Sequence, residues 1–414
     1  MEQAARPFLL DATRLISRSW TGRRATGIDR VCYAYLDRFR DNARAVVQFG
    51  GVVRALGNDH SDMLFDLLDG PDSNFRKQLK AGAPVALLGR DRPQDLSGAI
   101  YINASHTDFD LSGHARWVET NGVRPVYFLH DLIPITHPEI CRRKAVRRHT
   151  GRVRAALKCA AGIIVNSRST ADELRRFAGD SRLELPSVVA APLAGAQLMD
   201  PNAIPSATMQ GAQASGHVRP YFLCIGTIEP RKNYLMLLRV WERLVEKKGK
   251  LAPRLVIVGQ LGQDARFVRK VQDQIARLGE HVELVAGCDD ERLGQYVKHA
   301  NALLMPTLAE GFGLPLVEAL NAGTPVIASD LPALREMGQN IPLHLPPGNV
   351  EVWENAILSY DSPLSDRVRQ MTLLPAYKAY SWDDHFNAVE PWLWQLPQPR
   401  MQLAESPRLR QLRS

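Results

Sequence analysis

The sequence predicts two α/β domains, each doubly wound around a parallel sheet. The chain has 414 residues, which is enough for two hydrophobic cores. Short apolar runs alternate with helical patterns in both halves, as they do in doubly wound sheets. Between the halves, residues 196–218 are rich in Ala, Pro, Gly, Ser and Gln and lack apolar periodicity. We therefore expect this stretch to be a linker between the domains.

The first domain is predicted over residues 1–195. Its candidate strands are the short apolar runs Phe8–Leu10, Ala45–Phe49, Val85–Leu88, Ile100–Ile102, Val126–Leu129, Ile163–Val165 and Val188–Ala190. Between the first two runs, a glycine turn opens onto an amphipathic helix that reaches Phe39. After the sixth run, the spacing of Ser169 and Asp172 predicts the cap of another helix.

The second domain is predicted over residues 219–380. It begins with a strand and turn over 221–227, and its later strand candidates are Leu255–Val258, Val282–Val285, Ala302–Met305 and Pro325–Ala328. Residues 381–395 combine amphipathic spacing with many aromatic side chains, so we expect a final helix there. The remaining tail, 396–414, is polar and basic, which is a composition typical of disorder.

The stretch Met305–Glu318, MPTLAEGFGLPLVE, carries the strongest functional signal. It follows a short apolar run, so its turn should lie at the carboxyl end of a buried parallel strand. Gly311 and Gly313 allow a sharp turn and the close approach of a ligand, and the next helix would add unpaired N–H groups. Glu310 and Glu318 provide acceptors for sugar hydroxyls. The plainer alternative is one loop glutamate and one glutamate near a helix start, where the helix dipole favours it.

This stretch resembles the EX7E motif of retaining glycosyltransferases of the GT-B fold, specifically family 4. The resemblance implies two Rossmann-like domains that face each other across a cleft, with the last helix crossing back to the first domain. It implies an acceptor-binding first domain and a second domain that binds a nucleotide sugar. Glu310 would contact the reacting sugar as a catalytic residue, and Glu318 would hold the ribose hydroxyls. The donor-binding residues that it implies here are Glu310, Gly311, Phe312, Gly313, Leu314 and Glu318.

The turn Ile228–Asn233 is similar to the first turn of the donor domain in that family. There an arginine and a lysine grip the nucleotide diphosphate, and Arg231 and Lys232 occupy those positions as catalytic and donor-binding residues. A guanidinium beside an ammonium suits a departing pyrophosphate. The alternative is a pair of exposed basic residues in an ordinary turn. The family also holds the base through backbone groups after the strand that corresponds to Val282–Val285, which implies a role for Gly287.

Two segments of the first domain match the family less completely. Gly27 lies where the family has a glycine-rich loop facing the donor diphosphate, but this chain has one glycine where two are usual, and a plain helix N-terminus is the alternative. His130 and Asp131 begin a segment similar to HDL-P---PE of family 4 polysaccharide transferases. This implies a catalytic His130 near the reacting sugar and Asp131 on the acceptor side. The alternative is a histidine that caps its strand by hydrogen bonding inside the domain.

The resemblance implies retaining transfer of a mannose-like hexose from a nucleotide sugar such as GDP-mannose. The acceptor would be a saccharide or a lipid-linked molecule in bacterial surface polysaccharide biosynthesis. Neither a cofactor nor a metal is expected. A UDP-hexose donor is a close alternative. From other classes, a sugar-nucleotide epimerase and a non-catalytic nucleotide-sugar-binding subunit also stay open.

Composition and charge restrict the partners and the compartment. The net charge of +8 favours anionic partners such as nucleotide diphosphates and lipid phosphates. The basic run Arg142–Lys158 is typical of a solvated helix face, and peripheral contact with an anionic membrane is the alternative. Five scattered cysteines, no secretory signal and no apolar run of membrane-spanning length predict a cytoplasmic protein, at most peripheral on the inner face of the membrane. No nucleic-acid-binding motif occurs, so we expect no nucleic-acid partner.

The other motif patterns give no functional assignment. Asp108 and Asp110 form the DxD pattern that a different glycosyltransferase fold uses for a divalent metal, but they lie in a polar loop far from the donor half. We interpret them as surface residues. No G-x-G-x-x-G follows a strand, which argues against a nicotinamide enzyme, and no P-loop sequence G-x-x-x-x-G-K-[ST] occurs.

Overall fold

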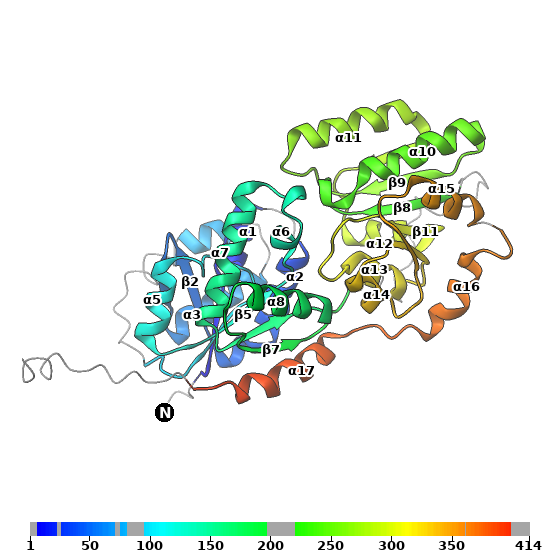
Figure 1. Cartoon of the computed structure of the whole chain (residues 1–414). Helices are drawn as coiled ribbons and strands as arrows, with labels where there is room; N and C mark the ends of the chain where they lie inside the picture. Colours follow the sequence, from blue (N-terminus) through cyan, green and yellow to red (C-terminus); the bar gives the residue numbers. More distant parts are fainter. Residues whose placement is uncertain are drawn as a thin grey trace, which may run out of the picture.

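The computed structural model describes residues 6–22, 26–70, 75–80, 95–196, 220–360 and 362–398. It contains two α/β domains that lie side by side, one built from each half of the chain (Figure 1). Of the sequence predictions, the strand Val85–Leu88, most of the linker 196–218 and the tail beyond residue 398 lie outside the described residues.

The first domain is built on a seven-stranded sheet with the order β3-β2-β1-β4-β5-β6-β7. Its strands are β1 (Phe8–Asp11), β2 (Ala43–Phe49), β3 (Val52–Ala55), β4 (Ile100–Asn103), β5 (Arg124–Leu129), β6 (Gly162–Val165) and β7 (Ser187–Ala190). The strand predictions on described residues are confirmed. The sequence missed β3, which pairs antiparallel with β2 at the sheet edge and is only partly buried, so it lacks an apolar run.

The helices of the first domain cover both faces of this sheet. They are α1 (Thr13–Thr21), α2 (Gly27–Phe39), α3 (Asn58–Asp69), α5 (Ser112–Asn121), α6 (Ile133–Thr136), α7 (Arg143–Cys159) and α8 (Arg168–Asp180). One prediction is corrected here. The cap of α8 is Ser167, whose side chain accepts from the backbone N–H of Thr170, and Ser169 lies inside the first turn.

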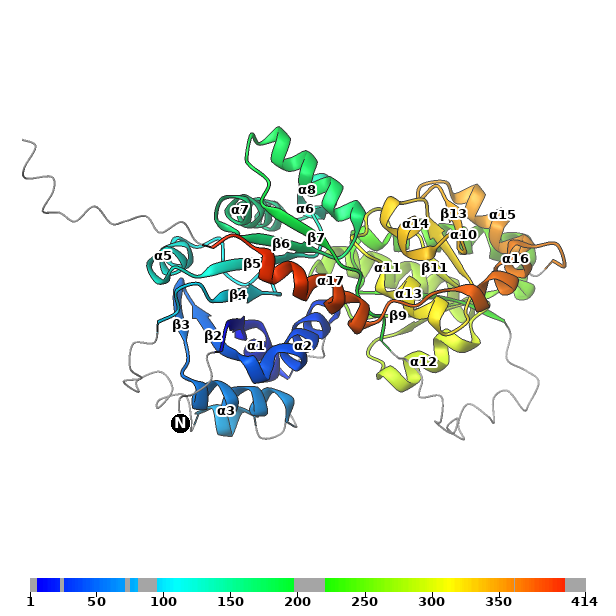
Figure 2. The same ribbon diagram turned by 90° about the horizontal axis from the view of Figure 1, so that it is seen from below.

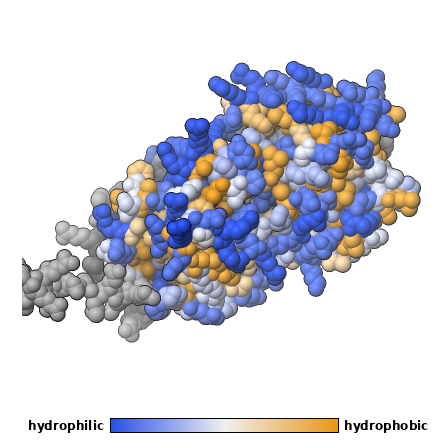
Figure 3. Space-filling view, viewed as in Figure 1, coloured by the Kyte–Doolittle hydropathy of each residue, from blue (hydrophilic) through white to orange (hydrophobic). Residues whose placement is uncertain are grey.

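The second domain is built on a parallel six-stranded sheet with the order β10-β9-β8-β11-β12-β13. Its strands are β8 (Tyr221–Ile225), β9 (Arg254–Val258), β10 (Val282–Val285), β11 (Ala302–Met305), β12 (Val326–Ser329) and β13 (Leu343–Leu345). Its helices are α10 (Tyr234–Lys248), α11 (Ala265–Leu278), α12 (Asp290–His299), α13 (Leu314–Asn321), α14 (Pro332–Gly338), α15 (Val350–Ser359) and α16 (Asp366–Leu373). The three-residue strand β13 was not predicted. The exposed sides of α10 and α11 are largely hydrophilic (Figure 3).

The last helix, α17 (Trp382–Gln395), packs against the first domain, as the resemblance implied (Figure 2). Its Trp392 and the following Leu396 cover Gly162 of β6 so closely that a Cβ atom there would lie 2.5 Å from the indole ring. His385 is fully buried, and its Nε2 lies 2.9 Å from the hydroxyl of Tyr35 in α2. The chain therefore returns to the domain in which it began.

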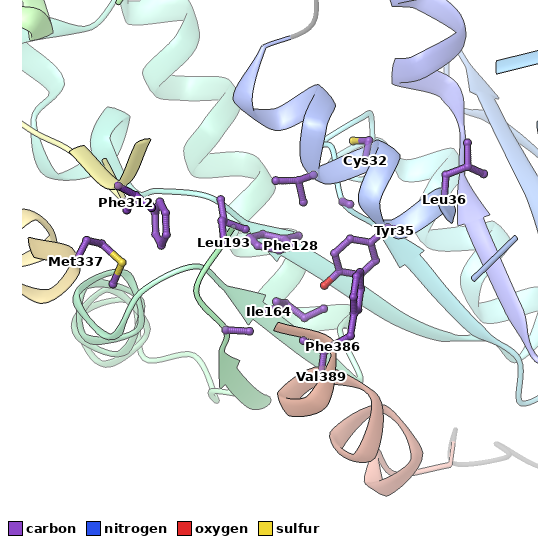
Figure 4. Packing of buried hydrophobic residues seen from close by; sticks show 14 of the residues in the cluster. Cys32, Tyr35, Leu36, Phe128, Ile164, Leu193, Phe312, Met337, Phe386 and Val389 are labelled. Atoms are coloured by element: carbon purple, nitrogen blue, oxygen red, sulfur yellow. The ribbon is translucent and has the colours of Figure 1, made fainter. Parts of the chain in front are cut away.

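One hydrophobic core cluster runs through both domains. Phe312 and Met337 come from the second domain, whereas Tyr35 and Phe128 come from the first, and Phe386 of α17 closes the cluster (Figure 4). Because packed side chains connect the domains, the loops at the carboxyl ends of both sheets are held against each other.

No helix among the described residues is long and apolar enough to cross a bilayer.

Candidate functional site

The candidate site starts from two neighbouring loops at the carboxyl edge of the second sheet. β8 and β11 are adjacent and parallel, so the turn after β8 and the turn after β11 leave the sheet side by side. The backbone carbonyl of Arg231 accepts from the N–H of Leu308 at 2.8 Å and from the hydroxyl of Thr307 at 3.0 Å. These bonds fix the basic turn to the start of the glycine-rich turn.

Glu310 and the two basic residues form one partly buried ion cluster. The carboxylate oxygen Oε2 of Glu310 accepts from Arg231 Nη1 at 2.9 Å and from Lys232 Nζ at 2.8 Å. Arg231 also donates to the carbonyl of Ala309 at 3.0 Å, which fixes its guanidinium. Burial opposes ionisation of Glu310, but the two cations outweigh it and lower the pKa of this carboxyl to about 2. The structure thus brings these three side chains together.

The glycine turn is shaped by contact with the first domain. Gly313 has a φ of +94°, which is a left-handed conformation that suits glycine, and it precedes α13 with its early proline. A Cβ atom on Gly311 would lie 2.5 Å from the carbonyl oxygen of His130 and 2.8 Å from Cβ of Asp131. Gly311 therefore lets the His130–Asp131 loop of the first domain approach the turn closely.

Ser167, which the sequence analysis did not select, holds the same turn. Its hydroxyl donates to the carbonyl of Gly311 at 2.8 Å, and Thr170 adds a longer hydrogen bond at 3.3 Å. Ser167 follows β6, next to β5, so its position at a carboxyl strand end was the available signal. The sequence analysis had assigned the helix cap to Ser169, whereas Ser167 both caps α8 and holds the glycine turn.

His130 lies at the carboxyl end of β5 and is buried. Its Nε2 lies 2.8 Å from the carbonyl oxygen of Ala104, and because a carbonyl only accepts, the proton is on Nε2. Burial lowers the pKa of the ring to about 4, so the imidazole is neutral at pH 7 with Nδ1 unprotonated. The ring stacks on Phe128 with centroids 4.4 Å apart. The hydrogen bond expected for a strand-capping histidine is thus present, in a loop that also touches the glycine turn.

Asp131 adjoins Gly311 and is held by its own loop. Its Oδ1 accepts from the N–H of Ile133 at 3.1 Å, and its carbonyl lies 2.9 Å from Nε2 of His149 on α7. These bonds fix the segment that the resemblance assigned to the acceptor side.

The start of α2 faces the start of α13. The Thr26 and Asp29 side chains form a capping box, so local groups satisfy part of this N-terminus, as in the plain-helix alternative. A Cβ atom on Gly27 would nevertheless lie 2.7 Å from a methyl group of Leu314. Gly27 therefore lies at the interface between the two domains.

Glu318 is reached from the first domain by Arg30, which the sequence analysis missed. Arg30 Nη1 lies 2.9 Å from Oε1 of Glu318, and the N–H of Ala196 donates to the same oxygen at 3.2 Å. Glu318 is only 4% exposed, and burial raises its pKa while Arg30 opposes the shift. Nothing in the sequence singled out Arg30, because the contact joins residues 288 positions apart.

Gly287 lies apart from this cluster. It follows β10, which is separated from β8 by β9, and it is exposed with a φ of +89°. Its backbone is open to solvent on the same sheet edge as Arg231.

The aspartates of the DxD pattern form ion pairs with the basic helix. Asp108 lies 2.5 Å from Arg148, and Asp110 lies 3.4 Å from Arg152, both on α7. Part of the positive charge of Arg142–Lys158 is thereby neutralised within the first domain.

The first domain also holds a cavity of about 1510 Å³ away from the ion cluster. It lies between α1, α3 and the strands β2 and β3, and its walls are mainly apolar. Gln48 and Thr13 supply polar groups, and Gln48 leads to the buried carboxylate of Asp11.

Comparison with known proteins gives a family match in the second half of the chain. Residues 208–365 match the family model of group 1 glycosyl transferases. The match lies over the second domain. This domain contains Arg231, Lys232, Glu310 and Glu318, which are the residues that suggested the resemblance.

Curated relatives resemble the chain over part of its length. It is 27% identical over 275 residues to the serotype-specific mannosyltransferase WbdA of Escherichia coli, which covers 64% of this chain and 33% of that protein. It is 29% identical over 167 residues to O-antigen chain mannosyltransferase B of Escherichia coli, which covers 40% of this chain and 43% of that protein. The chain thus spans about a third of WbdA and less than half of the second relative.

Solved structures share the whole architecture. Sucrose-phosphate synthase of Thermosynechococcus elongatus has a TM-score of 0.65 at 18% identity, covering 95% of this chain and 99% of that chain. Anabaena Alr3699/HepE in complex with UDP-glucose has a TM-score of 0.63 at 16% identity, covering 94% of this chain and 99% of that chain. The expected GT-B fold, with two Rossmann-like domains, is confirmed.

Proposed function

We propose that this chain is a retaining glycosyltransferase that moves a mannose-like hexose from a nucleotide sugar, such as GDP-mannose, to a saccharide or lipid-linked acceptor. The single observation that carries the proposal is the Arg231–Lys232–Glu310 cluster at the carboxyl edge of a group 1 domain, pressed against the His130–Asp131 loop. The mannosyltransferase relatives of O-antigen synthesis support the sugar and a role in bacterial surface polysaccharide synthesis.

In the proposed mechanism, the cationic pair stabilises the leaving diphosphate. Arg231 and Lys232 provide preorganised positive charge where negative charge develops as the C1–O bond of the donor breaks, so we propose that no metal is needed. The bond from the acceptor oxygen to C1 forms on the same face, and the acceptor proton goes to the departing phosphate oxygen. Glu310 holds both cations in place and accepts from sugar hydroxyls through its other oxygen.

His130 and Asp131 would meet the acceptor side of the sugar. Because the imidazole is neutral at pH 7, it offers Nδ1 as an acceptor and carries no charge that would repel the positive charge developing at C1 of the sugar. Gly311 lets this loop lie against the donor domain, and we propose that closure here excludes water that would otherwise hydrolyse the donor.

A panel of nucleotide sugars tests the proposal. The protein is incubated with GDP-mannose, UDP-glucose, UDP-galactose and UDP-N-acetylglucosamine, with and without a lipid-linked or oligosaccharide acceptor, in buffer with EDTA. Acceptor-dependent release of nucleoside diphosphate and a product with retained anomeric configuration support the proposal. A changed sugar still attached to its nucleotide indicates an epimerase, and tight binding without turnover indicates a binding subunit. Either result overturns it.

A further inference from the structure

Arg30 of α2 joins two elements of the opposite domain. Its Nη1 lies 2.9 Å from Oε1 of Glu318 in α13, and its Nη2 lies 2.9 Å and 3.0 Å from the two carboxylate oxygens of Asp290 in α12. A planar guanidinium can serve two carboxylates at once because its donors point in fixed, divergent directions. One first-domain side chain therefore contacts the donor domain at two places.

The two partners of Arg30 differ in their environment. The Glu318 side chain is 5% exposed, whereas that of Asp290 is 66% exposed. A buried carboxylate needs a cation or several hydrogen bonds to remain ionised, whereas an exposed one is solvated by water. The contact with Glu318 is therefore the one on which the geometry of the site depends.

The hydrogen bonds of Glu318 leave one oxygen available. Arg30 and the N–H of Ala196 both bind Oε1, and within the part of the chain that the structure describes Oε2 accepts no hydrogen bond. Both groups on Oε1 lie outside the second sheet, since Arg30 is in α2 and Ala196 precedes β8. The direction in which Oε2 points thus depends on where the first domain lies.

We propose that Arg30 is a positioning residue that orients Glu318 for the ribose hydroxyls of the donor, so that nucleoside recognition requires closed domains. This inference rests on the proposed function and adds the nucleoside-recognition step to it. When the domains separate, Glu318 loses its cation and its fixed orientation, and the affinity for the nucleoside falls. Arg30 therefore acts through Glu318 and not through the diphosphate.

Nucleoside and nucleotide binding together test this assignment. Binding of guanosine, uridine, GDP and UDP is measured by calorimetry for the wild type, Arg30→Ala, Glu318→Gln and the double variant. We expect Arg30→Ala to weaken the bound nucleoside and its diphosphate by a similar factor, roughly tenfold or more, as for the loss of a hydrogen bond to a charged group. The double variant should bind no more weakly than Glu318→Gln alone, because the two residues act as a unit.

Matched variants separate a positioning role from general damage. Arg30→Lys should recover part of the affinity, and Asp290→Asn should change it less than threefold because that partner is exposed. Arg38→Ala removes another interface arginine of α2, which pairs with Glu390 of α17, and should leave binding unchanged. Melting temperatures of all variants are compared with that of the wild type.

Three outcomes overturn the assignment. If Arg30→Ala weakens GDP or UDP but not the nucleosides, Arg30 contacts the diphosphate directly. If its effect adds in full to that of Glu318→Gln, the residues act independently. If Arg30→Ala binds every ligand like the wild type, the contact has no role in recognition. A wild type that binds no nucleotide and transfers no sugar would instead contradict the proposed function.

Discussion

At the scale of single residues, burial and charge pairing have opposite effects on the pKa of Glu310 in the ion cluster. Glu310 is partly buried, yet the two cations keep it ionised, and its carboxylate in turn holds the two cations in place. Such arrangements are typical of functional sites, where charge is kept in place before the ligand arrives. We therefore expect substitution of Lys232 to affect sugar transfer and substitution of Glu310 to affect the pH dependence of stability.

Lys232→Ala should lower the kcat for sugar transfer about 100-fold or more while the melting temperature stays close to that of the wild type. The activity falls because the variant lacks one of the two preorganised positive charges that stabilise the leaving diphosphate. The fold persists because Arg231 still neutralises Glu310. Lys248→Ala, an exposed lysine at the end of α10, is the control and should keep full activity. Normal transfer by the Lys232 variant would contradict the assigned role.

Glu310→Gln should change the pH dependence of the free energy of unfolding. The pKa of Glu310 is lowered from 4.5 to about 2 in the folded protein. Its ionised form therefore contributes fully to the free energy of unfolding above pH 4.5, and this contribution is lost as the pH falls towards 2. The gap in unfolding free energy between wild type and Glu310→Gln should therefore narrow by about 2 kcal/mol between pH 5 and pH 3. Urea titrations at several pH values measure it, and a constant gap would show that the ion cluster does not stabilise the fold.

At the scale of elements, the crossover helix α17 is attached through a buried histidine. Nδ1 of His385 lies 3.1 Å and 3.0 Å from the carbonyl oxygens of Ala191 and Pro192, so Nδ1 carries the proton and Nε2 accepts from the Tyr35 hydroxyl. The neutral ring satisfies both neighbours, and burial lowers its pKa to about 4.

His385→Asn should make the protein less sensitive to mild acid. Below pH 6.5 the unfolded chain binds a proton at this histidine and the folded chain does not until about pH 4, so wild-type stability falls in that window. Between pH 7 and pH 5 the wild type should lose about 2 kcal/mol more than the variant. Thermal or urea unfolding at both pH values provides the comparison. Equal losses would place the acid sensitivity in the other buried histidines.

At the scale of the whole molecule, the domains are joined by polar contacts as well as by the shared core. Besides Arg30 and Ser167, the N–H groups of Arg168 and Ser169 at the start of α8 donate to Glu336 of α14 at 2.9 Å and 3.1 Å. A carboxylate at a helix N-terminus is stabilised by the dipole and by unpaired donors. These contacts favour the closed arrangement of the two domains.

Combining Ser167→Ala with Glu336→Gln should shift the molecule towards an open arrangement. Small-angle X-ray scattering should give a larger radius of gyration for this double variant than for the wild type, and a saturating nucleoside diphosphate should reduce it. Asp330→Asn is the control, because Asp330 pairs with Arg335 inside the second domain. An unchanged radius for the double variant would show that the hydrophobic core alone holds the domains together.

The sequence by itself determined the strands and helices that carry the site, because local patterns report them. The apolar runs before His130, Arg231 and Glu310 located three carboxyl strand ends, and the glycines and proline after Glu310 located the turn and α13. The resemblance implied that Arg231, Lys232 and Glu310 all serve the donor, and the structure brings them together because β8 and β11 are neighbouring parallel strands.

Only the tertiary structure decided which groups cross the domain interface. Arg30 on Glu318, Ser167 on Gly311 and Glu336 on the start of α8 join positions more than a hundred residues apart, and each residue alone looks like an ordinary surface or capping side chain. The same holds for the edge strand β3, which is formed by pairing and not by an apolar run. The physical reason is that periodicity and turn chemistry act within a few residues, whereas these contacts depend on how two separately built domains fit together.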